Sequence, residues 1–290
     1  TKLLKIFNRA VRIENLCLEC NLQEWQMLKE RILNWRMKKN LKAISLTFPP
    51  NQQNNKIWKT LSSYLEIIRS LEIFISLKEI YSIINEAQKM KNLKRLGITV
   101  SDNRSSERYE AKIPFNELSQ LEKMTLTVVL NDSQDEENLL NNITLPQSLK
   151  DLKVKFITDD FGSSKKESYQ NFVEEIHKLS SLEKLSIAMK IPREGRFTDF
   201  ILMSIIKSIP NNIKDLILSL QFKDLEIFDD AIIWNEVSQL EMLENLSLEI
   251  HSENKNQNPA IMRISSQAKA LRKFHLASNS LELNLVDISR

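Results

Sequence analysis

The chain has 290 residues, of which 42% are hydrophobic and 27% are charged, and its 41 basic and 38 acidic residues leave a net charge of +3. This composition is typical of a folded globular protein and excludes disordered and collagen-like chains. Because basic and acidic residues are nearly equal in number, the charge does not require a nucleic acid as partner. Only three glycines are present, so the glycine-rich loops that bind nucleotide phosphates have almost no material to be built from.

Ten short segments with the pattern Leu-x-x-Leu-x-Leu recur along the chain, each starting about 28 residues after the last. The clearest copies read LKRLGITV, LEKLSIAM, IKDLILSL, LENLSLEI and LRKFHLASNSLEL. The ten copies start at Ile13, Leu41, Ile68, Leu93, Leu121, Leu149, Leu182, Ile213, Leu243 and Leu271. A fixed period of this length predicts one supersecondary unit stacked on itself, which builds an extended surface more often than a catalytic pocket.

Each copy alternates apolar and polar residues, which predicts a strand with one face on the core. In the copy from Leu149, for example, Leu152, Val154 and Phe156 alternate with charged residues. The copy from Ile68 is the least regular, because SLEIFISLKEI also fits a helix and the spacing to the next copy drops to 25 residues. We expect a kink or a flattened region there.

The 18 to 26 residues between the strands often carry helical spacing, which predicts a helix on the back of the sheet. The apolar triplets with this spacing are Phe172, Ile176 and Leu179; Ile201, Ile205 and Ile209; Trp234, Val237 and Leu240; and Ile261, Ile264 and Ala268. Prolines mark the ends of these helices. Pro114 and Pro259 predict helix starts, and Pro146 and Pro210 predict helix stops before the next strand.

The ten copies resemble a leucine-rich repeat protein, and their length and helical backs are similar to the ribonuclease-inhibitor-like class. The resemblance implies an α/β solenoid, a horseshoe with a parallel inner sheet and helices on the convex side. Residues 1–290 would then form a single domain of about ten repeats, and the first residue, Thr1, suggests a fragment or subunit of something larger. The Asn that tops each inner strand in this family is in register only at Asn279, so regular ladders are not expected.

Polar residues between the core leucines should face the hollow of such a horseshoe, with small side chains forming its floor. The central ones predict a basic stripe that could accept an acidic peptide or a phosphate backbone: Arg95, Lys123, Lys153, Lys155 and Lys184. The alternative is a solvated polar face, because Glu122 and Glu183 lie next to the lysines in the sequence. Aromatic residues are nearly absent from this face, which argues against stacking of single-stranded RNA.

Long polar loops that follow several strands should all leave the same edge of the sheet, since the strands are parallel. TDDFGSSKKES, KIPREGRFTD, SDNRSSERYEAK and SENKNQN would line one rim, and rims of this kind often bind partners. The basic rim residues predicted to bind a partner are Arg104, Arg108, Lys165, Lys166, Arg193 and Arg196.

The sequence contains no GxSxG turn, no HExxH and no carboxylate pair at a defined spacing, so we predict no catalytic residues and no enzyme activity. Cys17 and Cys20 could supply half of a zinc site, but His177, His251 and His275 lie in three distant repeats. We therefore predict no metal and no cofactor.

With only two cysteines and no apolar stretch of roughly 18 residues, the chain is expected to be intracellular and without a membrane span. The cytoplasm is favoured, and an organellar or ciliary location stays open. The predicted function is a non-enzymatic protein-protein interaction scaffold in a larger hetero-complex, binding through the concave sheet and the rim. Two alternatives stay open: an RNA-contacting subunit of a ribonucleoprotein or organellar complex, and the ligand-sensing repeat domain of a larger signalling receptor.

Overall fold

The computed structural model describes the greater part of the chain from residue 66 to residue 252 and shorter pieces on either side. The described ranges are 15–19, 23–24, 43–47, 66–102, 113–130, 139–158, 166–191, 204–222, 236–237, 239–252, 271–278 and 282–286. Ile201, Trp234, and the expected helix with Ile261, Ile264 and Ala268 lie outside these ranges, as does Asn279.

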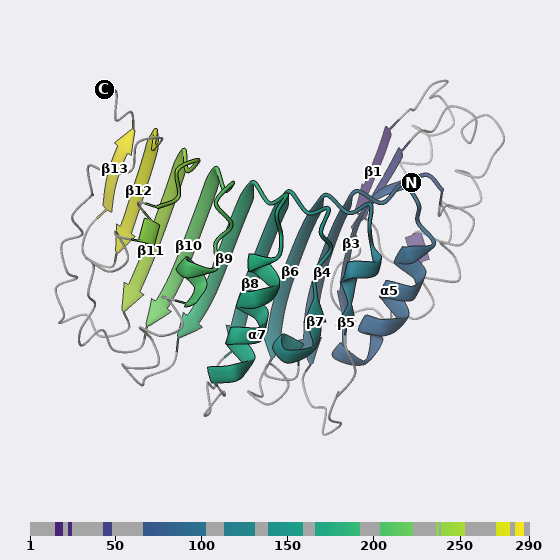
Figure 1. The fold of residues 1–290 in the computed structure, drawn as a ribbon. Helices are drawn as coiled ribbons and strands as arrows, with labels where there is room; N and C mark the ends of the chain where they lie inside the picture. The colour runs from purple at the N-terminus through teal and green to yellow at the C-terminus, as the bar shows by residue number, and fades with distance from the viewer. Residues whose placement is uncertain are drawn as a thin grey trace.

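One sheet of eleven strands organises the described residues, and its strands follow one another in chain order (Figure 1). The strands are β1 (Asn15–Glu19), β2 (Ala43–Thr47), β3 (Ile68–Ile75), β4 (Arg95–Asp102), β6 (Lys123–Leu130), β8 (Asp151–Thr158), β9 (Lys184–Ile191), β10 (Asp215–Phe222), β11 (Asn245–Ser252), β12 (Lys273–Ser278) and β13 (Glu282–Val286). Neighbours are parallel from β1 to β12, and β13 is antiparallel to β12. Each of the ten Leu-x-x-Leu-x-Leu copies forms one of the parallel strands, so the predicted parallel sheet and its leucine-rich-repeat-like character are confirmed.

The apolar residues of each strand point to one side of the sheet and form a continuous core. In β8, Leu152, Val154 and Phe156 are at most 2% exposed, whereas Lys153 and Lys155 between them are exposed. The same alternation of buried and accessible residues runs through β4, β6, β9, β10 and β11. Because burying a large aliphatic side chain stabilises a fold by about 1.5 to 3 kcal/mol, the stabilisation is spread along the whole array.

A tight turn of the same kind precedes six of the strands. In each, a backbone N–H donates to the carbonyl three residues earlier, and the donors are Leu93, Leu121, Leu149, Leu182, Ile213 and Leu243. The residue that follows each of these donors uses its backbone carbonyl to accept two N–H groups from the following repeat. The Lys94 carbonyl, for example, accepts from the N–H groups of Glu122 and Lys123. These bonds set each repeat on the previous one without an offset.

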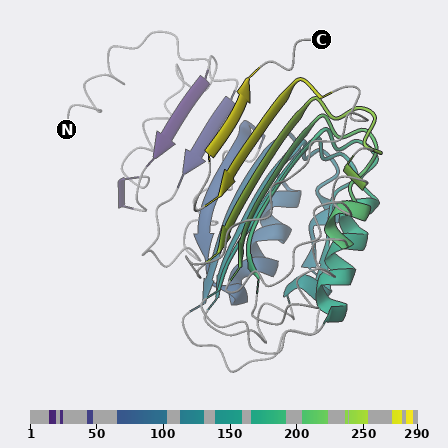
Figure 2. The same ribbon diagram turned by 90° about the vertical axis from the view of Figure 1, so that its left-hand side faces the viewer.

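Two helices, α5 (Ile80–Gln88) and α7 (Lys166–His177), lie against the same face of the sheet (Figures 1 and 2). A 3₁₀ turn, η2 (Leu77–Glu79), leads into α5. Helix α5 buries Ile80, Ile83, Ile84 and Ala87, which recur at helical spacing. In α7 the predicted core residues Phe172 and Ile176 are buried, and the ring of Phe172 packs edge-on against Phe156 of β8 at 5.7 Å between centroids.

The helix predicted after Pro114 is wrong. Pro114 belongs to a short strand, β5 (Ile113–Pro114), which pairs with β7 (Ile143–Thr144) in a second sheet, and only one 3₁₀ turn, η3 (Phe115–Glu117), follows. The turn before β6 begins at once, since the Leu121 N–H donates to the Leu118 carbonyl. One short turn therefore suffices to bury Phe115 and Leu118.

The two prolines predicted to stop helices lie in tight turns. The carbonyl of Pro146 accepts the N–H of Leu149, and that of Pro210 accepts the N–H of Ile213. A short helical segment precedes each proline, at 204–207 before Pro210 and at 139–142 before Pro146, with β7 between the second segment and Pro146. Proline fits both positions because the turn uses only its carbonyl.

The irregular copy from Ile68 is a strand and not a helix. Its pairing with β2 shifts register, since Ile44 lies opposite Ile68 but Ser45 lies opposite Ser70. This β-bulge or irregularity lies on the side of β2, whereas the pairing of β3 with β4, across the shortened spacing, is regular. At the other end of the sheet, β13 was not predicted; its antiparallel pairing gives the backbone of β12 a second neighbour.

Within the described ranges, no helix is both long and apolar enough to cross a membrane.

We expect Leu216→Ala to lower the free energy of unfolding by about 2 to 5 kcal/mol, because Leu216 in β10 is 0% exposed and its truncation leaves a cavity in the core. The matched change Lys153→Ala removes an exposed side chain and should cost about 0.5 kcal/mol or less. Urea unfolding followed by circular dichroism measures both. Equal losses for the two variants would contradict the inward and outward assignment of the strands.

Candidate functional site

The open face of the sheet, defined here as the side turned away from α5 and α7, is the extended surface that this fold presents (Figure 2). Strand register places its residues in rows across the strands. Row 1 runs Ser70, Arg95, Lys123, Asp151, Lys184, Asp215, Asn245 and Lys273. Row 2 runs Glu72, Gly97, Thr125, Lys153, Ser186, Ile217, Ser247 and His275. Row 3 runs Phe74, Thr99, Thr127, Lys155, Ala188, Ser219, Glu249 and Ala277.

Row 1 is a chain of ion pairs between neighbouring strands. Lys123 on β6 contacts Asp151 on β8, with 2.5 Å between Nζ and Oδ2. Lys184 on β9 pairs with Asp215 on β10, and the side-chain amide of Asn245 on β11 donates a hydrogen bond to the same carboxylate. The hydrogen bond and charge of Asp215 raise the pKa of Lys184.

The pKa of Asp215 reflects competing influences. Partial burial alone would raise it, but the hydrogen bonds from Lys184 and Asn245 and the charges of Lys184 and Lys214 outweigh burial, so the pKa lies below its ordinary value. The folded protein therefore favours the charged carboxylate at this position.

A second row of charges, the edge ladder, lies in the turns just before row 1 and alternates in sign. It runs Lys94, Glu122, Lys150, Glu183, Lys214, Glu244 and Arg272. Lys94 contacts Glu122 at 2.8 Å, Lys214 contacts Glu183 at 3.2 Å, and Arg272 contacts Glu244 at 3.8 Å. The hydrogen bond and charge of Lys94 lower the pKa of Glu122, with smaller contributions from Lys150 and Arg95. These are exposed pairs, which stabilise proteins little one by one.

The structure places all five residues of the predicted basic stripe at open-face positions, but their surroundings differ. Lys123 and Lys184 are neutralised by carboxylates in row 1. Arg95 lies close enough to Glu122 to affect its pKa. Lys153 and Lys155 are exposed and form no ion pair within the described ranges. The five residues are thus not one uniform stripe.

The predicted basic rim is mostly outside the part of the chain that the structure describes. Arg104, Arg108, Lys165, Arg193 and Arg196 lie there, and their role stays a prediction. The assignment of Lys166 to a loop is wrong, because it is the first residue of α7. The segment KESYQNFVEEIH has amphipathic helical spacing from its first residue. The helix therefore begins within the polar stretch TDDFGSSKKES that was assigned to a loop.

Residues with metal-binding or catalytic chemistry do not gather in the described ranges. No group of three or more His, Cys, Asp or Glu side chains there could hold a metal ion. Cys17 on β1 is exposed, and Cys20 lies outside the described residues. His177 ends α7. His251 and His275 belong to the neighbouring strands β11 and β12, so the expectation of three distant repeats is wrong for this pair.

Two exposed isoleucines on the open face were missed by sequence reasoning. Ile157 on β8 is 39% exposed and Ile217 on β10 is 42% exposed. The alternation that places Lys153 and Lys155 outward also places Ile157 outward, so the signal was present in the sequence. A large aliphatic side chain on a solvated sheet face loses the benefit of burial unless something covers it.

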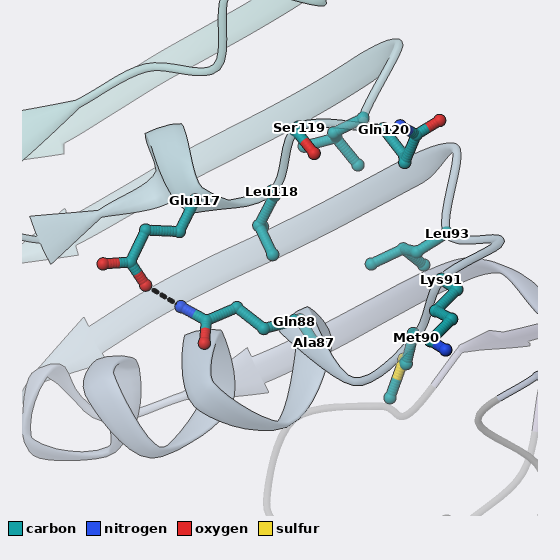
Figure 3. A pocket seen from close by; sticks show the side chains of 10 residues that line it. Ala87, Gln88, Met90, Lys91, Leu93, Glu117, Leu118, Ser119 and Gln120 are labelled. Carbon is teal, nitrogen blue, oxygen red and sulfur yellow. Dashed lines mark hydrogen bonds between the residues drawn. The ribbon is translucent and has the colours of Figure 1, made fainter.

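One shallow pocket of about 50 Å³ lies beside α5, between its last turn and η3 (Figure 3). It is lined by Ala87, Gln88, Met90, Lys91, Leu93, Glu117, Leu118, Ser119, Gln120 and Leu121. Gln88 donates a hydrogen bond to Glu117 across it. Small-molecule sites have volumes of about 300 to 1,000 Å³, so this pocket is too small to hold a metabolite, and the open face is the stronger candidate site.

Comparison with known proteins leaves the family open. No family model matches the chain, and no curated protein matches it. Among solved structures, internalin C2 from Listeria monocytogenes is similar over 76% of this chain and 84% of its own, with 11% sequence identity and a TM-score of 0.30. Similarity at that level does not establish a shared function.

We expect Asp215→Asn to lower the free energy of unfolding at pH 7 by about 0.5 to 1 kcal/mol, because it removes the Lys184 ion pair. Since the pKa of Asp215 is lowered by folding, its contribution is present above the ordinary value of 3.8 and is lost as the pH falls through the lower pKa of the folded protein. Urea unfolding of the wild type and variant at several pH values measures the difference, which should shrink below about pH 4. A difference that grows on acidification would show that the carboxylate is not stabilised in its charged form.

Proposed function

We propose that the chain is a non-enzymatic protein-interaction scaffold of the ribonuclease-inhibitor-like leucine-rich-repeat type, with the open face as the concave side of a horseshoe. A helix with its side chains is about 10 Å wide, whereas neighbouring strands lie about 4.8 Å apart. A sheet that carries helices on one side therefore has that side on the outer arc. α5 and α7 are on the same side, so the open face would line the inner arc.

The open face itself is the observation that carries the proposal. From β4 to β10, rows 2 and 3 present mostly short polar and small side chains, with Lys153, Lys155 and the exposed Ile217 among them. No helix of the described ranges lies over this face (Figure 2). A broad, continuous surface of this kind fits a protein partner, and the pocket beside α5 offers no comparable site for a small molecule.

The charge pattern favours a protein over RNA. Binding of a nucleic acid backbone depends on the number of phosphates that free cations neutralise. In row 1, Asp151 and Asp215 already neutralise two of the five predicted cations, Lys123 and Lys184. A protein partner needs fewer charges and can also use the two exposed isoleucines. We place the scaffold inside the cell because the chain has only two cysteines. We propose that it acts there as a subunit of a hetero-complex.

A bulky side chain in the middle of the open face should block the partner. Ser186→Trp adds an indole to row 2, and Glu174→Trp adds the same group to the exposed surface of α7 as a matched control. We expect a partner captured with the wild-type chain from its source cell, and then reconstituted from purified components, to bind Ser186→Trp at least about tenfold more weakly. The Glu174→Trp variant should keep wild-type affinity, as measured by calorimetry.

Circular dichroism and thermal unfolding of both variants control for misfolding. Loss of the partner with Glu174→Trp alone would place the interface on the helical side and reject the proposal. Equal binding of all three proteins would exclude the centre of the open face.

A further inference from the structure

In the middle of rows 2 and 3 the open face has a local excess of positive charge, and it lies on a single strand. In rows 2 and 3 between β4 and β10, the only charged residues are Lys153 and Lys155. Their neighbours in these rows are Thr125 and Thr127 on β6 and Ser186 and Ala188 on β9. These neighbours are short, so the two lysines stand above their surroundings and both are exposed.

Carboxylates of the described ranges do not neutralise this excess. The acidic residues of rows 2 and 3 are Glu72 on β3 and Glu249 on β11, each three strands from β8. At a strand spacing of about 4.8 Å, that separation is roughly 14 Å, which exceeds the Debye length of about 8 Å at physiological ionic strength. Asp151 is closer to Lys153 along β8, but it is paired with Lys123.

The same strand continues with an exposed apolar residue. Ile157 follows Lys155 at the next outward position and is 39% exposed. The half-buried Val129 occupies the outward position next to it on β6, since Val129 lies opposite Ile157 in the register. Along β8 the outward side chains therefore read cation, cation, apolar, at intervals of about 6.6 Å.

This spacing selects the conformation of a partner. An extended segment presents every second side chain to one side at the same interval of about 6.6 Å, so three of its side chains match three positions on β8. A helix presents side chains of one face at i, i+4 and i+7, which rise about 6 and 10.5 Å along its axis and fall out of step by the third position. The geometry favours an extended partner over a helical one.

We propose that Lys153, Lys155 and Ile157 form a docking row for an extended protein segment that carries two acidic residues and one apolar residue at alternate positions. The inference rests on the proposed function, because it names the partner segment for the same open face. The carboxylates pair with the two lysines, and the apolar side chain covers Ile157 and the neighbouring Val129. In row 1 the two lysines nearest to β8, Lys123 and Lys184, are paired with aspartates and contribute little attraction to such a segment.

Synthetic nonapeptides test the row directly on the full chain. The probes are fluorescein-labelled Ser-Thr-Glu-Thr-Glu-Thr-Val-Thr-Ser, the same sequence in reverse order, and a scrambled peptide of the same composition with the two glutamates adjacent. Fluorescence polarisation at about 20 mM salt measures binding. We expect one of the two alternating peptides to bind at least about fivefold more tightly than the scrambled one, and to weaken at least about tenfold at 500 mM salt.

Variants show whether the binding is at the row. Lys153→Gln with Lys155→Gln should weaken binding of the preferred peptide at least about tenfold, and Ile157→Ser should weaken it about threefold or more. Lys89→Gln with Lys178→Gln makes the same change in net charge at exposed lysines of the helical side, and should alter binding less than about twofold. Equal binding of alternating and scrambled peptides, or equal losses in the two double variants, would overturn the proposal.

Two further measurements separate this inference from the proposed function. If a reconstituted partner is blocked by Ser186→Trp but is unaffected by Lys153→Gln with Lys155→Gln, the open face binds a partner and the docking row is rejected. If Ser186→Trp has no effect on the partner, the proposed function fails, whatever the peptides do. A twenty-nucleotide oligouridine that binds more tightly than any peptide, and needs the same two lysines, would assign the row to phosphates and overturn the proposal.

Discussion

The backbone hydrogen bonds between successive turns are the constraint on which the other features depend. At each repeat one carbonyl accepts two N–H groups of the following repeat, from Lys94 through Glu122, Lys150, Glu183 and Lys214 to Glu244. The strands then continue in register from these bonds, so equivalent positions of successive repeats stand side by side. Without this zero offset, the outward residues would form no rows, and neither the ion pairs nor the exposed lysines would be where they are.

The charges of the edge ladder alternate in sign from one repeat to the next. Basic and acidic residues alternate over seven successive turns from Lys94 to Arg272, so each charge has opposite neighbours. Each exposed pair contributes only about 0.2 to 1 kcal/mol. If one repeat were omitted from the stack, the two ladder charges on either side of it would have the same sign. Their repulsion would raise the free energy of that arrangement. We infer that the ladder acts mainly on the order in which repeats stack, through the difference between correct and incorrect pairings.

The strands were predictable from the sequence because a strand with one face in the core must alternate, and the alternation repeats ten times. Even the irregular copy from Ile68 was found as a strand, although its register shift against β2 was not located. The layer behind the sheet was harder to predict. The residues around Phe115 fit a helix start as well as they fit η3, and the choice depends on how soon the Leu121 turn begins. Strand β13 lies beyond the last copy of the repeat, so the repeat pattern could not predict it.

The sequence predicted which residues of the candidate site lie on the open face, but not which of their charges are paired. The sequence placed Lys123, Lys153 and Lys184 on one face, yet the carboxylates that pair with Lys123 and Lys184 stand about 30 residues away and depend on register. In row 1 a carboxylate occupies the next strand after Lys123 and again after Lys184. In rows 2 and 3 the strand after Lys153 and Lys155 carries serine and alanine, and the strand before them carries threonines.

Within rows 2 and 3 this contrast concentrates the positive potential on β8. Row 1 and the edge ladder contain more charges, but their pairs cancel over distances shorter than the Debye length of about 8 Å. Lys153 and Lys155 lie farther than that from the carboxylates of their own rows, so their field extends into solvent. An approaching acidic segment is therefore attracted to one strand in the middle of the sheet, although basic residues are spread over most of its width.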